Sequence, residues 1–83
     1  MTNMPTEVAS ALAVLGAEAY ALGKLPEAEA AYRRALEMQT ALLDAGRTEL
    51  APDCATSWNN LGNVLLDQQR LVEAEAAYRR ALE

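Results

Sequence analysis

Apolar side chains recur every three or four residues through most of the chain, which is the spacing of one face of an α-helix. In the first such segment the recurring positions are Leu12, Leu15, Gly16, Ala19 and Leu22. A later segment repeats the pattern with Trp58, Leu61, Gly62 and Leu65. We predict an all-α chain of about four helices, which cover residues 5–22, 26–45, 52–68 and 71–83.

Glycine and proline separate these helices and predict how they connect. Gly23 can take the left-handed conformation just past a helix end, and Pro26 suits the first turn of the next helix. Gly46 is the expected end of the second helix, and Pro52 lies near the start of the third. The chain is thus predicted to form two antiparallel helix-turn-helix hairpins.

The phrase EAEAAYRRALE occurs twice, at residues 27–37 and again at residues 73–83. A shift of 46 residues superposes the two copies and extends the match upstream, where Gly16 falls on Gly62. We expect one domain spanning residues 1–83 and built from two related units. Repeat one covers about residues 9–54, and repeat two, which is truncated, covers about residues 55–83.

Composition argues against several classes of function. The net charge of −5 and the pI near 4.6 disfavour binding to nucleic acid or to an anionic membrane surface. The absence of histidine and the single cysteine, Cys54, exclude the usual metal-ligand clusters. Without histidine or a glycine-rich phosphate loop, we expect no enzymatic activity and no cofactor.

Cys54 also bears on the location of the protein. A lone cysteine cannot form an intrachain disulfide and is compatible with a reducing cytoplasm, where we expect the protein to be. We expect Cys54 to be a packing residue rather than a reactive thiol. No stretch has the eighteen or more apolar residues that a membrane span needs, about that many being required to cross a bilayer.

The motif Trp58-x2-Leu61-Gly62-x2-Leu65, followed by Ala74-x3-Tyr78, resembles the tetratricopeptide signature. The first unit carries a looser version in Leu15, Gly16, Ala28 and Tyr32. The resemblance implies an α-solenoid in which these small residues lie where the two helices of a hairpin cross and the large residues fill the space beside them.

The unit departs from the usual tetratricopeptide pattern in two respects. Its period is 46 residues, whereas about 34 is usual, and Thr40 replaces the helix-ending proline. This most resembles the longer kinesin-light-chain type of repeat, and similar arrays occur in bacterial multidomain signalling proteins of the NTPase class. By this resemblance the chain is expected to be a fragment of a longer bacterial array.

The resemblance implies a protein-interaction scaffold whose first helices line a concave surface that holds an extended peptide or a partner helix. On the third helix, three carboxamides that can donate to and accept from a peptide backbone share one flank: Asn59, Asn60 and Asn63. The matching flank of the first helix carries Ala13, Ala17 and Tyr20. These six residues are the candidate partner-binding site, although the asparagines would also be explained by solvation or by bonds to a neighbouring helix.

A second possible role is structural self-assembly without a foreign peptide. Arrays of this kind generally need about three or more repeats, and this chain has two. We expect the core to contain Trp58, Leu61, Leu65, Tyr78 and Leu82, with Leu36, Leu42 and Leu43 nearby, and we expect Val72 and Ala76 to face water. Such exposed apolar surface predicts self-association, most simply as a symmetric dimer.

Overall fold

The computed structural model describes residues 4–83, which form an all-α fold of two antiparallel hairpins, as predicted. The first hairpin pairs α1 (Met4–Ala21) with α2 (Leu25–Asp44), and the second pairs α3 (Ala51–Asp67) with α4 (Leu71–Leu82). A short 3₁₀ helix, η1 (Thr48–Leu50), joins the hairpins. Each α-helix boundary lies within one residue of the prediction.

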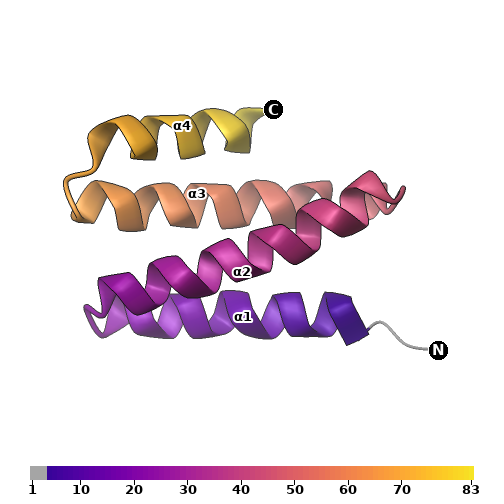
Figure 1. Cartoon of the computed structure of the whole chain (residues 1–83), viewed down its shortest axis with the longest axis horizontal. Coiled ribbons are helices and arrows are strands. Elements are labelled where there is room, and N and C mark those ends of the chain that lie inside the picture. The colour runs from indigo at the N-terminus through magenta and orange to yellow at the C-terminus, as the bar shows by residue number, and fades with distance from the viewer. Residues whose placement is uncertain (1–3) are drawn as a thin grey trace.

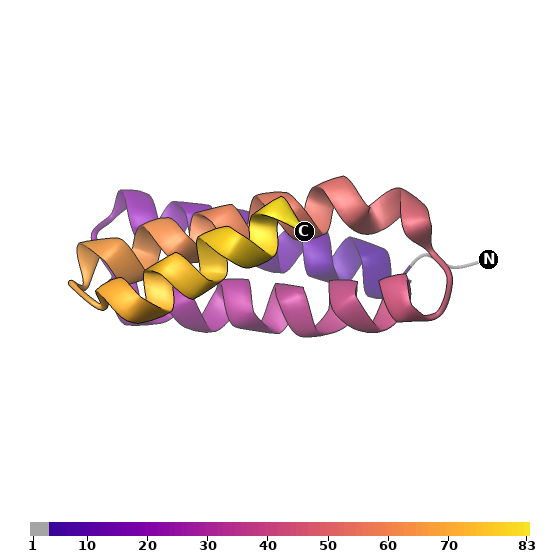
Figure 2. The same ribbon diagram turned by 90° about the horizontal axis from the view of Figure 1, so that it is seen from above.

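The four α-helices lie side by side in chain order and form a flat slab of 40 × 26 × 14 Å (Figure 1). The α2 helix crosses obliquely between α1 and α3. The tight turns of both hairpins lie at the same end of the slab, while the link through η1 lies at the other (Figure 1). Figure 2 shows the same slab from above, with α2 along one edge and α3 reaching the opposite edge toward its N-terminal end, where η1 joins it to α2.

The two tight turns share one backbone geometry although their sequences differ. In the first, Gly23 has a φ of 77° and the Lys24 N–H donates to the carbonyl of Ala19 at 2.8 Å. In the second, Gln69 takes the left-handed conformation with a φ of 63°, although it is not glycine. As in the first turn, a backbone hydrogen bond closes the second turn, from the Arg70 N–H to the carbonyl of Leu65 at 2.9 Å, and Gln69 adopts a conformation that costs an ordinary residue about 1–2 kcal/mol.

Both hairpins pack a tyrosine ring over a glycine, as the duplicated motif predicts. A Cβ atom built on Gly16 would lie 3.0 Å from the ring of Tyr32, and one built on Gly62 would lie 2.6 Å from Tyr78 Cε1. Real Cβ atoms essentially never approach other atoms as closely as the second value. The absence of a side chain at both glycines therefore lets the two helices of each hairpin approach closely.

The core lies mainly between the hairpins, where α3 packs against α2. Its buried members include Ala28, Tyr32, Leu36, Cys54, Leu61, Val64, Leu65, Ala74 and Ala77. Cys54 is a buried free thiol beside Thr40, with Sγ 3.9 Å from the hydroxyl oxygen, which confirms its packing role. Val72 and Ala76 are exposed, as predicted.

Other parts of the predicted core are corrected by the structure. Leu82 is 88% exposed, and Leu15 and Leu22, from the apolar stripe predicted for the first helix, are 55% and 71% exposed, because no helix within residues 4–83 covers the outer sides of α1 and α4. Trp58 and Tyr78 are half-buried instead of enclosed. Each outer helix packs mainly against its hairpin partner, so the apolar residues on its other side remain partly in water.

Arg70 ties the second hairpin to the first through Glu29 and also binds Glu73 of its own hairpin. Its guanidinium donates to Glu29 of α2 at 2.7 Å and to Glu73 of α4 at 2.7 Å. Burial acts to raise the pKa of Glu29, but the hydrogen bonds from Arg33 and Arg70 outweigh it and lower that pKa overall. The hydrogen bond from Arg70 likewise lowers the pKa of Glu73. This cluster fixes the end of the slab near the tight turns.

Candidate functional site

The face shared by α1 and α3 contains a shallow hollow of about 210 Å³. It is lined mostly by small and polar side chains: Ser10, Ala13, Gln39, Asp53, Thr56, Ser57 and Asn60. Two of the six predicted site residues, Ala13 and Asn60, are therefore brought together from different hairpins. The hollow offers hydroxyl, carboxylate and carboxamide groups to a ligand.

Two other predicted residues make bonds within the fold. The Tyr20 hydroxyl donates to Asp67 Oδ2 at 2.7 Å and thereby links α1 to α3. That hydrogen bond is the main cause of the raised pKa of Tyr20, with a smaller effect of burial. Asn63 accepts a hydrogen bond from the Tyr78 hydroxyl at 2.5 Å, so the neighbouring-helix explanation applies to this asparagine.

The remaining two predicted residues, Asn59 and Ala17, are exposed and do not line the hollow. On a helix, positions 59 and 60 point about 100° apart, because about 3.6 residues complete a turn. The three asparagines therefore do not act as one uniform flank. Asn60 faces the hollow, Asn63 bonds to Tyr78, and Asn59 is in water.

Gln39 is a residue of the hollow that the sequence analysis did not identify. It comes from α2, is only 6% exposed, and its Oε1 is buried without a hydrogen-bond partner. A buried polar atom left unpaired costs about 1–3 kcal/mol. The one available signal was a carboxamide placed among apolar residues of the second helix, three positions after Leu36.

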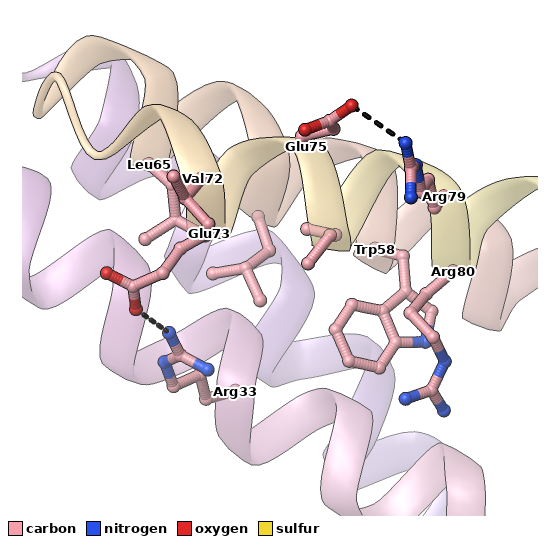
Figure 3. Close-up of a pocket in the computed structure, with 11 residues that line it drawn as sticks. Arg33, Trp58, Leu65, Val72, Glu73, Glu75, Arg79 and Arg80 are labelled. Carbon is pink, nitrogen blue, oxygen red and sulfur yellow. Dashed lines mark hydrogen bonds and ion pairs between the residues drawn. The ribbon is translucent and has the colours of Figure 1, made fainter.

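A larger, more apolar groove lies between α2 and α4 (Figure 3). It has a volume of about 490 Å³ and its floor is formed by Trp58, Leu61 and Leu65 of α3. An adjoining hollow of about 490 Å³ continues along α2 and shares Trp58 and Leu61 with it. Leu61 and Leu65 are each 1% exposed and belong to the core, as predicted, whereas the half-buried Trp58 opens to the groove.

Charged side chains border this groove on both sides. Arg80 extends over the Trp58 ring, with its guanidinium carbon 4.6 Å from the ring centre, and forms a cation–π contact. Arg33 and Glu73 face each other across the groove at 3.8 Å (Figure 3). An apolar floor between charged rims suits a protein surface better than a small neutral ligand.

Groups of metal-binding side chains and membrane-spanning helices are both absent from the described part of the chain. Within residues 4–83, no group of three or more carboxylate, cysteine or histidine side chains is placed to hold a metal ion. In the same part of the chain, none of the helices has both the length and the apolar character required to cross a membrane.

Paired antiparallel helices, repeated along the chain with the same glycine–tyrosine crossing, define a helical-repeat protein. The tetratricopeptide repeat family model matches residues 14–83, which is most of the chain, and the protein belongs to this family. Tetratricopeptide repeats are non-enzymatic scaffolds that generally mediate protein–protein contacts. Comparisons with curated proteins and with solved structures gave no match.

Proposed function

We propose that this chain is a protein-binding module that acts without chemistry of its own and holds an extended peptide or a partner helix against α1 and α3. The observation that carries the proposal is the polar hollow between these helices, in which Asn60 and the unpaired Gln39 lie together. A peptide backbone offers both donors and acceptors, which matches the carboxamides and hydroxyls of the lining.

Gln39 gives the proposal a specific mechanism. Its carboxamide is more than nine-tenths buried and Oε1 lacks a partner, so the free chain bears a desolvation cost. Because Oε1 is enclosed in the free chain, it can pair with an N–H group of a bound peptide only when the Gln39 side chain turns toward the hollow, and that pairing would remove the cost. Sites that are destabilising in the free protein and favourable in the complex are typical of binding surfaces.

The test is a random peptide library displayed on phage and selected against the 83-residue chain, followed by titration of the enriched peptides. Gln39→Leu should raise the free energy of unfolding by about 1–3 kcal/mol, because it removes the unpaired buried acceptor. The same change should weaken peptide binding. Glu37→Leu, at an exposed position of α2, is the matched control and should leave binding intact.

Two results would refute the proposal. One is a library that yields no peptide whose binding depends on Asn60 or Gln39. The other is a set of peptides whose binding is lost on substitution of Trp58 alone, because this would move the site to the groove between α2 and α4.

Self-association without a foreign peptide is the second candidate. It is favoured by exposed apolar side chains at both outer helices, among them Leu22 at 71%, Val72 at 82% and Leu82 at 88%. Surface of this kind generally marks a contact with another protein. The symmetric dimer expected from the sequence is one form that such association can take.

We further propose that the repeat is of the kinesin-light-chain type and that the protein is cytoplasmic. The 20-residue α2 supports the first assignment, because it continues through Thr40 to Asp44 where the shorter repeat would end. The free, buried thiol of Cys54 is compatible with the second.

A further inference from the structure

Residues of α1 lie 46 positions before their counterparts in α3. By this correspondence, the outer side of α1 matches the side of α3 that packs on the first hairpin. Leu15 is 55% exposed whereas its counterpart Leu61 is 1% exposed, and Val8 is 40% exposed whereas its counterpart Cys54 is 6% exposed. The α1 helix thus leaves in water the side that α3 buries. We call Val8, Leu15 and Leu22 the donor face.

The second hairpin carries an uncovered copy of the surface that receives α3. In the first hairpin this surface includes Leu36, which is 5% exposed; its counterpart Leu82 is 88% exposed. Here a hollow of about 410 Å³ opens on the side of α4. We call its apolar lining the acceptor face, which consists of Leu66, Leu71, Ala74, Tyr78 and Leu82.

The charges needed to join the two faces are present in the same register. Between the hairpins of one chain, Arg70 donates to Glu29 at 2.7 Å. When this interface is shifted by 46 residues, Lys24 of the copy that supplies the donor face lies in the place of Arg70. Glu75 of the copy that supplies the acceptor face lies in the place of Glu29. Lys24 is exposed, and the Glu75 side chain is 65% exposed.

A second ion pair is matched in the same way. Within the chain, Arg33 of α2 faces Glu73 of α4 at 3.8 Å. The shift replaces Glu73 by Glu27 of the donor and Arg33 by Arg79 of the acceptor, so the charges again have opposite signs. Each of the two salt bridges between the hairpins within residues 4–83 therefore corresponds to a residue pair of opposite charge in the shifted register.

From this register we propose that the donor face of one copy docks on the acceptor face of a second copy, head to tail, as α3 docks on the first hairpin. Lys24 then pairs with Glu75, and Glu27 with Arg79. The inference rests on self-association, the second candidate function, and not on peptide binding between α1 and α3. Because donor and acceptor are different surfaces, the contact does not close at two copies and can continue into a row.

One apolar position of the internal interface is replaced by a charged residue in the donor. Val64 is fully buried in the internal interface, and its counterpart on the donor is Glu18, which is exposed in the free chain. Docking would bring this carboxylate against the apolar acceptor face, which is unfavourable without a partner. The contact between wild-type copies is therefore expected to be weak, and Glu18 is the residue that weakens it.

The primary test is sedimentation velocity of the full chain over a wide concentration range. Wild-type protein should show an average mass that rises with concentration without a plateau at two copies. Glu18→Val, which copies Val64, should strengthen association by roughly tenfold or more. Circular dichroism should show unchanged helicity, because Glu18 is exposed.

Charge reversal tests the register. Lys24→Glu and Glu75→Lys should each weaken association by roughly three- to tenfold, since exposed ion pairs contribute modestly. An equimolar mixture of the two variants should recover association, because the reversed charges are then opposite across the new contact. Glu37→Lys, which lies outside both faces, is the control for net charge. It should neither weaken association on its own nor restore association when mixed with Lys24→Glu.

The outcomes separate the head-to-tail contact from self-association in general. A mass that stops at two copies, or a mixture that does not recover, overturns the head-to-tail contact and leaves a dimer possible. Chains that remain monomeric at all concentrations, with Glu18→Val included, overturn both. Peptide titration of the Asn60 and Gln39 variants is read independently of either result.

Discussion

Gly62 lies directly under the aromatic ring of Tyr78, so close that a Cβ atom at position 62 would come within 2.6 Å of Tyr78 Cε1. The Tyr78 ring is half-buried, and its hydroxyl donates to Asn63, one residue after the glycine. A side chain at position 62 must therefore push the ring outward and break that hydrogen bond.

We predict that Gly62→Leu lowers the free energy of unfolding by about 1–3 kcal/mol through overpacking of the hairpin crossing. Gly16→Leu should cost more, because the Tyr32 ring is 3% exposed and has less room to move. Urea unfolding measures both, with Ala21→Leu at an exposed position as the control. Equal stability of wild type and Gly62→Leu would contradict the crossing.

Acid should loosen the contact between the hairpins. The pKa values of Glu29 and Glu73 are lowered in the folded state by their bonds to Arg70 and Arg33. A lowered carboxyl pKa contributes stability above the unfolded-state value, and this stability is lost as the pH falls through the folded-state value. Urea midpoints should therefore drop between neutral pH and about pH 3.

Arg70→Gln tests the origin of that pH dependence. The variant should be less stable at neutral pH and should lose less stability on acidification, because Glu73 has lost its main partner and Glu29 has lost one of two. Glu37→Gln, on the exposed side of α2, should keep the wild-type slope. Parallel pH profiles for Arg70→Gln and wild type would show that this cluster is not responsible.

Gln69→Gly should stabilise the chain. Gln69 has a φ of 63°, which glycine adopts without steric cost, as Gly23 does in the matching turn. The gain is expected to be at most about 1 kcal/mol, because glycine also increases the entropy of the unfolded chain. Thermal unfolding measures it, and a lower melting temperature than wild type would contradict the argument.

Alanine substitutions of the three asparagines should have different effects on peptide binding and on stability. Changing all three should weaken peptide binding while helicity is kept or raised, because alanine is the better helix former. Asn60→Ala should account for the lost binding, while Asn63→Ala should lose stability by removing the acceptor of Tyr78. Equal peptide affinity of wild type and the triple variant would refute the role of these side chains.

Several features of the fold follow from local sequence alone. The helix spans were predicted because the apolar period, the glycine after each of the first two helices and the prolines act within one turn of the chain. The crossings of Gly16 with Tyr32 and of Gly62 with Tyr78 were predictable from the repeated motif. Such features depend on residues that are close in sequence or duplicated in register.

The burial of side chains on the outer helices was decided by tertiary structure. Leu15 and Leu61 occupy the same position of the repeat, yet one is 55% exposed and the other 1%. The difference is that α2 covers Leu61, while none of the described helices covers Leu15. Periodicity identifies an apolar side of a helix, but it carries no information on whether another helix lies against that side.

The candidate site likewise combines features that follow from the sequence with features that only the tertiary structure decided. The sequence by itself determined the repeat, its helices and the presence of carboxamides on the third helix, because these depend on residue type and spacing. Only tertiary structure placed Gln39 beside Asn60 and paired Tyr20 with Asp67, 47 residues away. Contacts between separate helices depend on how the hairpins stack, and side-chain spacing within one helix does not specify that stacking.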